Sequence, residues 1–185
     1  MGNDFYELFL DDTMMYSSGH YVSDTDTLHD AQRQKVARLI DQLQLKDGDH
    51  VLEIGSGWGY VAIEMAKSCD CKVDTITLSV EQKVYVEKRV AEAGLSDQIS
   101  VELIDYRDKQ GQYDAIVSVE MIEAVGHEFL STYFVACNRL LKPSGRFALQ
   151  AITYPDAFYD EYKNNTDFIR EYIFPGGHLP CLGII

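Results

Sequence analysis

Short apolar stretches alternate with helical patterns from about residue 30 to residue 154. The apolar stretches predict β-strands at residues 50–54, 72–78, 99–104, 113–119 and 146–154. Apolar residues that recur every three or four positions predict helices at residues 31–43, 60–68, 80–93 and 129–141. Strands and helices that alternate in this way are typical of an α/β protein with a doubly wound, mostly parallel sheet. Residues 155–185 are rich in tyrosine and acidic side chains and fit no simple period.

Stop signals and the absence of linkers complete this pattern. Gly94 is expected to end the third helix, and the Lys-Pro-Ser-Gly turn at 142–145 is expected to end the fourth. No repeat, low-complexity tract or interdomain linker interrupts the 185 residues. The sequence therefore predicts one domain over residues 1–185.

The charge balance excludes some classes of partner. Lys and Arg number 16 against 30 Asp and Glu, which gives a formal net charge of −14. Such a chain repels nucleic acid and anionic membranes, so any lipid contact must be apolar and local. No apolar run approaches the roughly 20 residues that cross a bilayer, and the N-terminus lacks the order of a signal peptide. We expect a cytoplasmic protein whose contact with membranes is peripheral and transient.

Cysteine and histidine spacing gives no sign of a metal site. The four cysteines lack the paired C-x-x-C spacing of zinc sites, and the five histidines are scattered along the chain. We therefore expect free thiols and no resident metal.

A glycine-rich turn joins the first predicted strand to the next helix. In LEIGSGWGY, Gly55, Gly57 and Gly59 lack side chains where a ligand could approach the backbone and the free N–H groups of a helix N-terminus. Glu53 adds a carboxylate at the end of the strand. The G-x-G-x-G spacing with this acid resembles motif I of class I S-adenosylmethionine methyltransferases, rather than the dinucleotide spacing G-x-G-x-x-G. The alternative is a tight turn with a purely structural role.

Polar side chains follow the next two predicted strands. Thr77 and Gln82 lie in TLSVEQ, and Asp105 and Tyr106 lie in IDYRD. Because ligands of parallel sheets bind outside the carboxyl ends of the strands, these residues are expected to reach the same ligand as the glycines. Carboxylate and amide groups can bind a ribose and an adenine amine, and an acidic rim suits a cationic sulfonium. The alternative is that each is an ordinary polar loop residue.

Six stretches in this order resemble one known family. They are GNDFYELFLDDTMMYSSG, VLEIGSGWG, ITLSVEQ, SVEMIEAVGHEFL, LQAITYPD and DFIREYIFPGGHLP. Together they are similar to the cyclopropane-fatty-acid synthase family of class I methyltransferases, most of all to its plant-like eukaryotic branch. The resemblance reaches Pro180. It implies a Rossmann-like fold in which residues 1–28 cap the cofactor, residues 29–154 form the core and residues 155–185 begin an acyl-pocket insertion.

The resemblance also implies a reaction. Members of the family transfer the methyl group of S-adenosylmethionine to a cis double bond of an unsaturated phospholipid acyl chain. The resulting carbocation loses a proton and closes a cyclopropane ring, with a bound bicarbonate as the base. An anion placed beforehand in a dry, apolar site is well suited to stabilise such a cation.

The same resemblance assigns roles near the N-terminus. Tyr16 and Ser17 would lie over the sulfonium region of the cofactor. Ser18 stands where the family usually has a cysteine that contacts bicarbonate, and its hydroxyl can still donate a hydrogen bond.

Three further catalytic assignments lie later in the chain. Glu123 matches the family glutamate and would orient the bicarbonate or share its proton, the alternative being a carboxylate at a helix start. Gln150 replaces the family histidine at the end of the fifth strand and could bind an oxyanion through its amide. Ile152 would offer its backbone to the same anion.

The ends of the chain prompt a last expectation. Compared with the family, the chain looks truncated at both ends and lacks the closing strands of the sheet. An uncovered sheet edge could pair with another copy or a relative, which gives a homo-oligomer or hetero-oligomer.

Two alternatives to lipid methylation stay open. One is an amine N-methyltransferase, and the other is a non-catalytic cofactor-binding module that pairs with a full-length relative.

Overall fold

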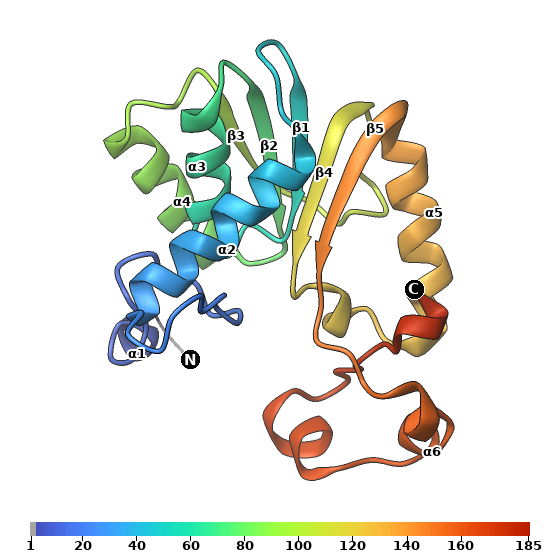
Figure 1. Cartoon of the computed structure of the whole chain (residues 1–185). Helices are drawn as coiled ribbons and strands as arrows, with labels where there is room; N and C mark the ends of the chain where they lie inside the picture. Colours follow the sequence, from blue (N-terminus) through green and yellow to red (C-terminus); the bar gives the residue numbers. More distant parts are fainter. Residues whose placement is uncertain (1–2) are drawn as a thin grey trace.

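A five-stranded, all-parallel β-sheet forms the centre of the computed structural model, which describes residues 3–185 (Figure 1). The strands are β1 (His50–Ile54), β2 (Lys72–Thr77), β3 (Ile99–Leu103), β4 (Tyr113–Val119) and β5 (Leu141–Gln150). Their order is β3-β2-β1-β4-β5, so the path of the chain reverses between β1 and β4, and β3 and β5 are the edges. Ligands bind at such a reversal, outside the carboxyl ends of the strands. The predicted α/β fold is confirmed.

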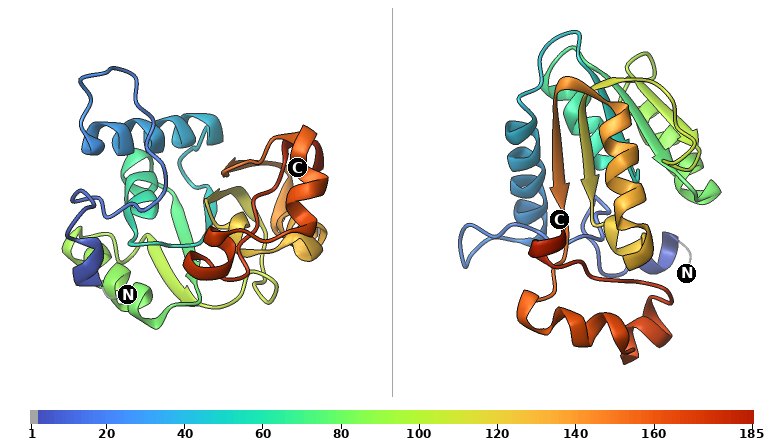
Figure 2. Two further views of the ribbon diagram at one scale, coloured as in Figure 1. Left: turned by 90° about the horizontal axis from the view of Figure 1, so that it is seen from below. Right: turned by 90° about the vertical axis from the view of Figure 1, so that its right-hand side faces the viewer.

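Helices cover both faces of the sheet. They are α2 (Leu28–Leu43), α3 (Tyr60–Ser68), α4 (Val80–Glu92) and α5 (Leu130–Leu140). One core cluster packs α2, α3 and α4 against the face that carries Val51 and Val73, and another packs α5 against the face that carries Leu52 and Ile116. Figure 2 shows α2 and α5 on opposite sides of the sheet. Because successive residues of β1 point to opposite faces, burial of both faces explains its continuous apolar sequence.

Local capping signals set the helix ends. α2 begins three residues earlier than the pattern predicts, because Thr27 and Asp30 form a capping box. The Thr27 side chain accepts a hydrogen bond from the Asp30 N–H (3.2 Å), and the Asp30 carboxylate accepts one from the Thr27 N–H (3.1 Å). Gly94, with φ of 70°, follows the end of α4 as expected.

The fifth strand differs from the prediction at both ends. Leu141 already pairs with Tyr113, and pairing resumes at Arg146 opposite Ala115, so the Lys-Pro-Ser-Gly sequence interrupts a strand instead of preceding it. The strand then ends at Gln150, not at residue 154. The reason is that the last pair of the β4–β5 ladder is Val119 with Gln150, after which β4 has ended.

Two segments lie beyond the carboxyl ends of the strands (Figure 1). The N-terminal segment (residues 3–27) contains α1 (Asn3–Tyr6). The C-terminal segment (residues 151–185) contains η3 (Asp156–Phe158), α6 (Tyr159–Asn164), the π-helical turn η4 (Ile169–Ile173) and η5 (Leu182–Ile184). The rings of Tyr16 and Phe174, one from each segment, are 6.4 Å apart, so the segments approach each other beside the strand ends.

Two remaining points concern the first residues of the chain and membrane-spanning helices. Met1 and Gly2, which belong to the predicted capping segment, are outside the described residues. Within residues 3–185, no helix is both long enough and apolar enough to span a bilayer.

Candidate active site

The turn between β1 and α3 holds three glycines in left-handed conformations. Gly55, Gly57 and Gly59 have φ angles of 96°, 48° and 85°. A Cβ atom at Gly59 would lie 2.8 Å from Cγ1 of Val86, so this glycine allows α3 and α4 to pack closely. A Cβ atom at Gly57 would meet no atom within 4 Å, so this glycine borders open space. The turn therefore offers a ligand both accessible backbone and the N-terminal N–H groups of α3.

Glu53, expected at the end of the first strand, is buried within the sheet and does not form part of an open rim. The residue is 2% exposed, and its Oε2 accepts a hydrogen bond of 2.5 Å from Oγ1 of Thr75. Burial raises the pKa of Glu53 to about 8, although the Thr75 hydrogen bond acts in the opposite direction. At neutral pH the carboxyl group therefore holds its proton and ties β1 to β2 below the glycine turn. Its contact with a cofactor stays a prediction.

The end of β2 brings Thr77 and Gln82 into direct contact. Oγ1 of Thr77 donates a hydrogen bond of 2.7 Å to Oε1 of Gln82, which fixes the orientation of the amide. Ser79 caps α4 by accepting a hydrogen bond from the Gln82 N–H at 3.2 Å. The N–H of Ile104 donates to the Thr77 carbonyl at 3.1 Å, so the end of β3 stays beside the end of β2. These contacts place the polar residues of both strand ends on one edge of the sheet.

Asp105 and Tyr106 occupy the end of β3. The Asp105 carboxylate accepts hydrogen bonds from Nε (2.9 Å) and Nη2 (2.6 Å) of Arg107, and these bonds hold the pKa of Asp105 below its usual value. The Tyr106 ring packs edge-on against Tyr133, with centroids 5.4 Å apart. Asp105 is therefore ionised at neutral pH, but Arg107 already partners it. Sequence reasoning missed this basic partner, although it lies only two positions away.

Tyr16 and Ser17 lie in the N-terminal segment beside α2. Oγ of Ser17 accepts a hydrogen bond of 2.7 Å from Nζ of Lys35, and its carbonyl accepts one of 2.8 Å from Nε2 of Gln32. The Tyr16 residue is 49% exposed, and its ring is 5.3 Å from that of Tyr6. Ser17 is thus anchored to α2, while the ring of Tyr16 stays accessible to a ligand.

Lys35 is a functional candidate that sequence reasoning missed. It is 3% exposed, and burial lowers its pKa to about 8, although the charges of Glu120 and Asp11 act in the opposite direction. The available signal was polar: Gln32 and Lys35 lie one turn apart on the face of α2 that also carries Val36. Buried polar groups on an otherwise apolar face need partners, and Ser17 supplies one of them.

Ser18 and Gln150 meet at a second residue that sequence reasoning missed, Glu120. Oε1 of Glu120 accepts hydrogen bonds from the Ser18 N–H (3.0 Å) and from Nε2 of Gln150 (2.8 Å). Nε2 of Gln150 also donates to the Ser18 carbonyl at 3.1 Å. Both protons of the Gln150 amide are therefore engaged, and its expected role toward an oxyanion stays a prediction. Glu120 has a left-handed φ of 48°, a conformation that a non-glycine residue adopts at some energetic cost.

Glu123 lies in η1 (Ile122–Ala124), which begins three positions after the last residue of β4. Its Oε1 accepts a hydrogen bond of 2.6 Å from the Ile152 N–H, whereas Oε2 is buried without a hydrogen-bond partner among residues 3–185. Burial is the main cause that raises the pKa of Glu123, and the Ile152 hydrogen bond opposes it. A carboxylate with a raised pKa is a stronger base, and its unpaired oxygen can accept a proton or a ligand hydrogen bond.

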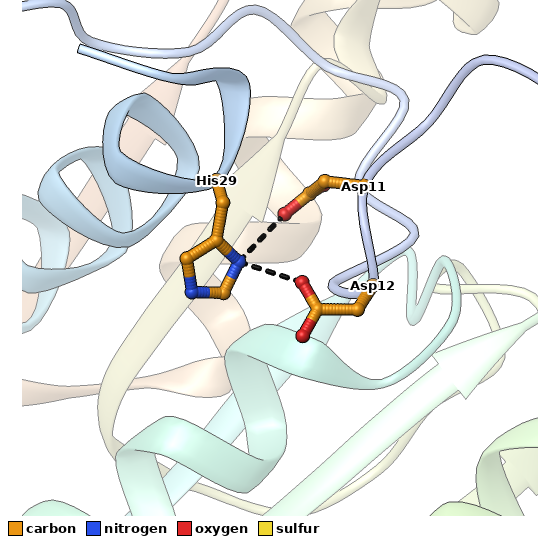
Figure 3. Close-up of side chains that lie close together, drawn as sticks. All are labelled: Asp11, Asp12 and His29. Atoms are coloured by element: carbon orange, nitrogen blue, oxygen red, sulfur yellow. Dashed lines mark hydrogen bonds and ion pairs between the residues drawn. The ribbon is translucent and has the colours of Figure 1, made fainter.

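Three side chains at the start of α2 form a further cluster, which Figure 3 shows. Nδ1 of His29 lies 3.0 Å from Oδ2 of Asp11 and 2.6 Å from Oδ1 of Asp12. Burial would lower the pKa of His29, but the hydrogen bonds to the two aspartates outweigh it and raise the pKa. The three residues have the donor types of a cation site, which histidine spacing did not suggest. Their ion pairs also give them a structural role, since they hold the N-terminal segment against α2.

Comparison with known proteins now decides the family. The family model for mycolic acid cyclopropane synthetase matches residues 1–185. The chain belongs to the mycolic acid cyclopropane synthetase family. This family match confirms the resemblance found from the six sequence stretches, whereas the assignment to a plant-like branch stays a prediction.

Two curated relatives and one crystal structure define the similarity within the mycolic acid cyclopropane synthetase family. The chain is 43% identical over 190 residues to tuberculostearic acid methyltransferase UfaA1 of Mycobacterium tuberculosis, which covers 97% of this chain and 44% of the relative. It is 41% identical over 182 residues to cyclopropane-fatty-acyl-phospholipid synthase of Escherichia coli K12. This match covers 98% of this chain and 45% of the relative. The chain thus spans less than half the length of these two relatives.

The crystal structure is that of mycolic acid cyclopropane synthase CmaA1, complexed with SAH and CTAB. It matches with a TM-score of 0.90 at 31% identity and covers 99% of this chain and 67% of CmaA1. The Rossmann-like methyltransferase fold that the sequence predicted is therefore confirmed.

Proposed function

We propose that this protein is an S-adenosylmethionine-dependent methyltransferase that acts on cis double bonds of unsaturated acyl chains in phospholipids. Support comes from the family match over residues 1–185 and from two relatives, which are named tuberculostearic acid methyltransferase and cyclopropane-fatty-acyl-phospholipid synthase. Since the chain covers less than half of each relative, the activity of these 185 residues is the point to test.

The residues at the strand ends fit the cofactor. S-adenosylmethionine supplies an electrophilic methyl group when it is bound. Gly57 borders open space beside the N-terminus of α3, and the net charge of −14 favours a cationic sulfonium. The residues proposed to hold it are Tyr16, Ser17, Glu53, Gly55, Gly57, Gly59, Thr77, Gln82, Asp105 and Tyr106.

The observation that carries the proposed chemistry is the buried, unpartnered Oε2 of Glu123. A methyl group added to a double bond leaves a positive charge on a substrate carbon, and ring closure then requires the loss of a proton. A negative charge placed beforehand stabilises that cation most effectively in a site that excludes water. We assign both tasks to Glu123, because its raised pKa makes the carboxylate a suitable proton acceptor.

Bicarbonate dependence remains a separate part of the proposal. Its expected donors are the Ser18 hydroxyl, the Gln150 amide and the Ile152 N–H. The amide protons of Gln150 already bind Glu120 and Ser18, and the Ile152 N–H already binds Glu123. A bicarbonate ion would have to replace these contacts. Turnover compared between bicarbonate-depleted and bicarbonate-supplemented buffer tests this point.

Methyl transfer itself can be tested with labelled S-adenosylmethionine and vesicles of unsaturated phospholipid. Glu123→Gln should retain affinity for S-adenosylhomocysteine and lower turnover by about 10²-fold to 10⁴-fold, the usual contribution of a general base. Glu92→Gln is the matched control, because Glu92 lies on α4 with its side chain 64% exposed. Full turnover by Glu123→Gln would refute the assigned role.

Two other outcomes would replace this proposal. Labelled product from an amine panel, and none from lipid, would identify an N-methyltransferase. Cofactor binding without any turnover, together with co-purification of a longer relative, would identify a non-catalytic module. The edge strand β5 offers a place for such pairing, which size-exclusion chromatography at several concentrations would detect.

A further inference from the structure

A cavity of about 510 Å³ lies between the start of α5 and the C-terminal segment. Its polar lining includes His127, Lys163, Asn164, Arg170 and His178, and its acidic lining residue is Glu128. In a chain with almost twice as many acidic as basic residues, this lining is unusual, because its basic side chains outnumber the acidic one. A local cationic surface of this kind is what an anion needs to approach an acidic protein.

Both histidines of this cavity are held by one tyrosine hydroxyl group. Nδ1 of His127 lies 2.8 Å from the hydroxyl oxygen of Tyr159, and Nε2 of His178 lies 2.7 Å from the same oxygen. The hydroxyl group can donate to one ring while it accepts from the other. The arrangement fixes the His127 ring by Nδ1 and leaves its second nitrogen for other contacts. His178 adds no charge at neutral pH, because burial, together with nearby Arg170 and His127, lowers its pKa to about 4.

Arg170 is the most firmly placed cation of the cavity. Its guanidinium group lies 4.8 Å from the centre of the Tyr162 ring. Nε donates to the Gly177 carbonyl at 3.2 Å, and Nη1 donates to the carbonyls of Tyr162 (2.8 Å) and Asn165 (2.5 Å). These contacts engage Nε and Nη1. Nη2 makes no hydrogen bond within residues 3–185, so a planar donor group is positioned in advance for an anionic oxygen.

Lys163 can join such an anion with little rearrangement. Its ammonium group pairs with Asp160 one helical turn earlier at 2.6 Å, and the Asp160 side chain is 91% exposed. Ion pairs of exposed groups are weak, so a phosphate oxygen can recruit the same ammonium group. Asn164 adds an amide at the adjacent position.

We propose that this cavity binds the phosphate group of the phospholipid substrate. The cavity and the site of Glu123 share a wall, because the N–H of His178 donates to the Glu123 carbonyl at 2.8 Å. A phosphate held there would anchor one end of the lipid while the acyl chain extends toward the strand ends. This inference rests on the proposed function, because it names the part of the proposed substrate that the chain recognises. Free inorganic phosphate presents the same chemistry and must be distinguished from the lipid.

The test is a binding titration of the purified 185-residue chain with three probes. They are monomeric dihexanoyl phosphatidylglycerol, dihexanoylglycerol, which has the same acyl chains without phosphate, and inorganic phosphate. Lys163→Glu is the variant, and Lys67→Glu is the matched control. Lys67 also pairs with an acid one helical turn away, Glu64 at 2.9 Å, and its reversal changes the net charge by the same amount.

We expect Lys163→Glu to raise the dissociation constant for the phosphatidylglycerol at least tenfold, while Lys67→Glu leaves it unchanged. Neither variant should change the affinity for dihexanoylglycerol. His127→Gln should also raise the dissociation constant for the phosphatidylglycerol. Equal effects of the two charge reversals, or no effect of either, would overturn the proposal. A chain that binds inorganic phosphate but does not bind the phosphatidylglycerol would also overturn it. S-adenosylhomocysteine affinity and methyl transfer, measured on the same samples, report on the proposed function separately.

Discussion

Gly57 and Gly59 have similar backbone conformations but different surroundings, so alanine should affect them in different ways. Both residues have a positive φ, which costs an L-residue about 1–2 kcal/mol. Only at Gly59 would the new methyl group also collide with Val86, at 2.8 Å. At Gly57 the methyl group would enter open space that we assign to the cofactor.

The magnitudes follow from these surroundings. Overpacking of a well-packed core costs roughly 1–3 kcal/mol, so Gly59→Ala should lower the free energy of unfolding by about 2–5 kcal/mol in total. Gly57→Ala should lower it by only about 1–2 kcal/mol. The same Gly57→Ala change should weaken the binding of S-adenosylhomocysteine at least tenfold, which corresponds to about 1.4 kcal/mol of binding free energy. Gly59→Ala should bind S-adenosylhomocysteine almost normally under conditions in which it is folded.

Urea denaturation and calorimetric titration of both variants measure these two quantities. Val86→Ala provides a further check, because it removes the methyl groups that Gly59→Ala would strike. The double variant Gly59→Ala/Val86→Ala should therefore be more stable than the sum of the single changes predicts, by roughly 1–3 kcal/mol. Equal stability losses at the two glycines, or normal cofactor affinity in Gly57→Ala, would refute the reasoning.

Three further predictions concern charged side chains. Burial lowers the Lys35 pKa from 10.5 to about 8, so its stabilising contribution is complete above pH 10.5 and is lost as the pH falls through 8. Urea titrations measure the free energy of unfolding at pH 7.5 and at pH 10.5. Its increase between these two pH values should be roughly 3 kcal/mol larger in wild type than in Lys35→Met. The raised pKa of His29 means that its contribution is complete below pH 6.5 and is lost as the pH rises through the raised value. The melting-temperature difference between wild type and His29→Gln should therefore shrink from pH 5.5 to 8.5, and a constant difference would contradict this. Arg170→Lys should accelerate proteolysis within residues 151–185 and leave the core intact, because lysine cannot reproduce the hydrogen bonds to three carbonyls.

Local patterns predicted most of the fold. The bounds of β1, α3 and β4 agree with the sequence prediction, because each element has a continuous pattern and clear boundaries. The fifth strand was less predictable, since its start and end depend on pairing with β4 and not on its own residues. The glycine turn was recognisable for the same local reason, but its two roles were not. Only the packing of Val86 shows that Gly59 serves the core while Gly57 faces open space.

The sequence by itself determined the succession of strands and helices along the chain, the glycine turn and the family resemblance, and it predicted a role for Glu123. These features depend on neighbours along the chain or on short motifs. Tertiary structure alone decided that Ser18 contacts Gln150, 132 positions away, through their shared partner Glu120. It also decided that Lys35 is buried against Ser17 and that Arg170, Lys163 and His127 line one cavity. Such contacts depend on how distant segments pack, and the identity of a polar residue does not reveal which distant partner it will meet.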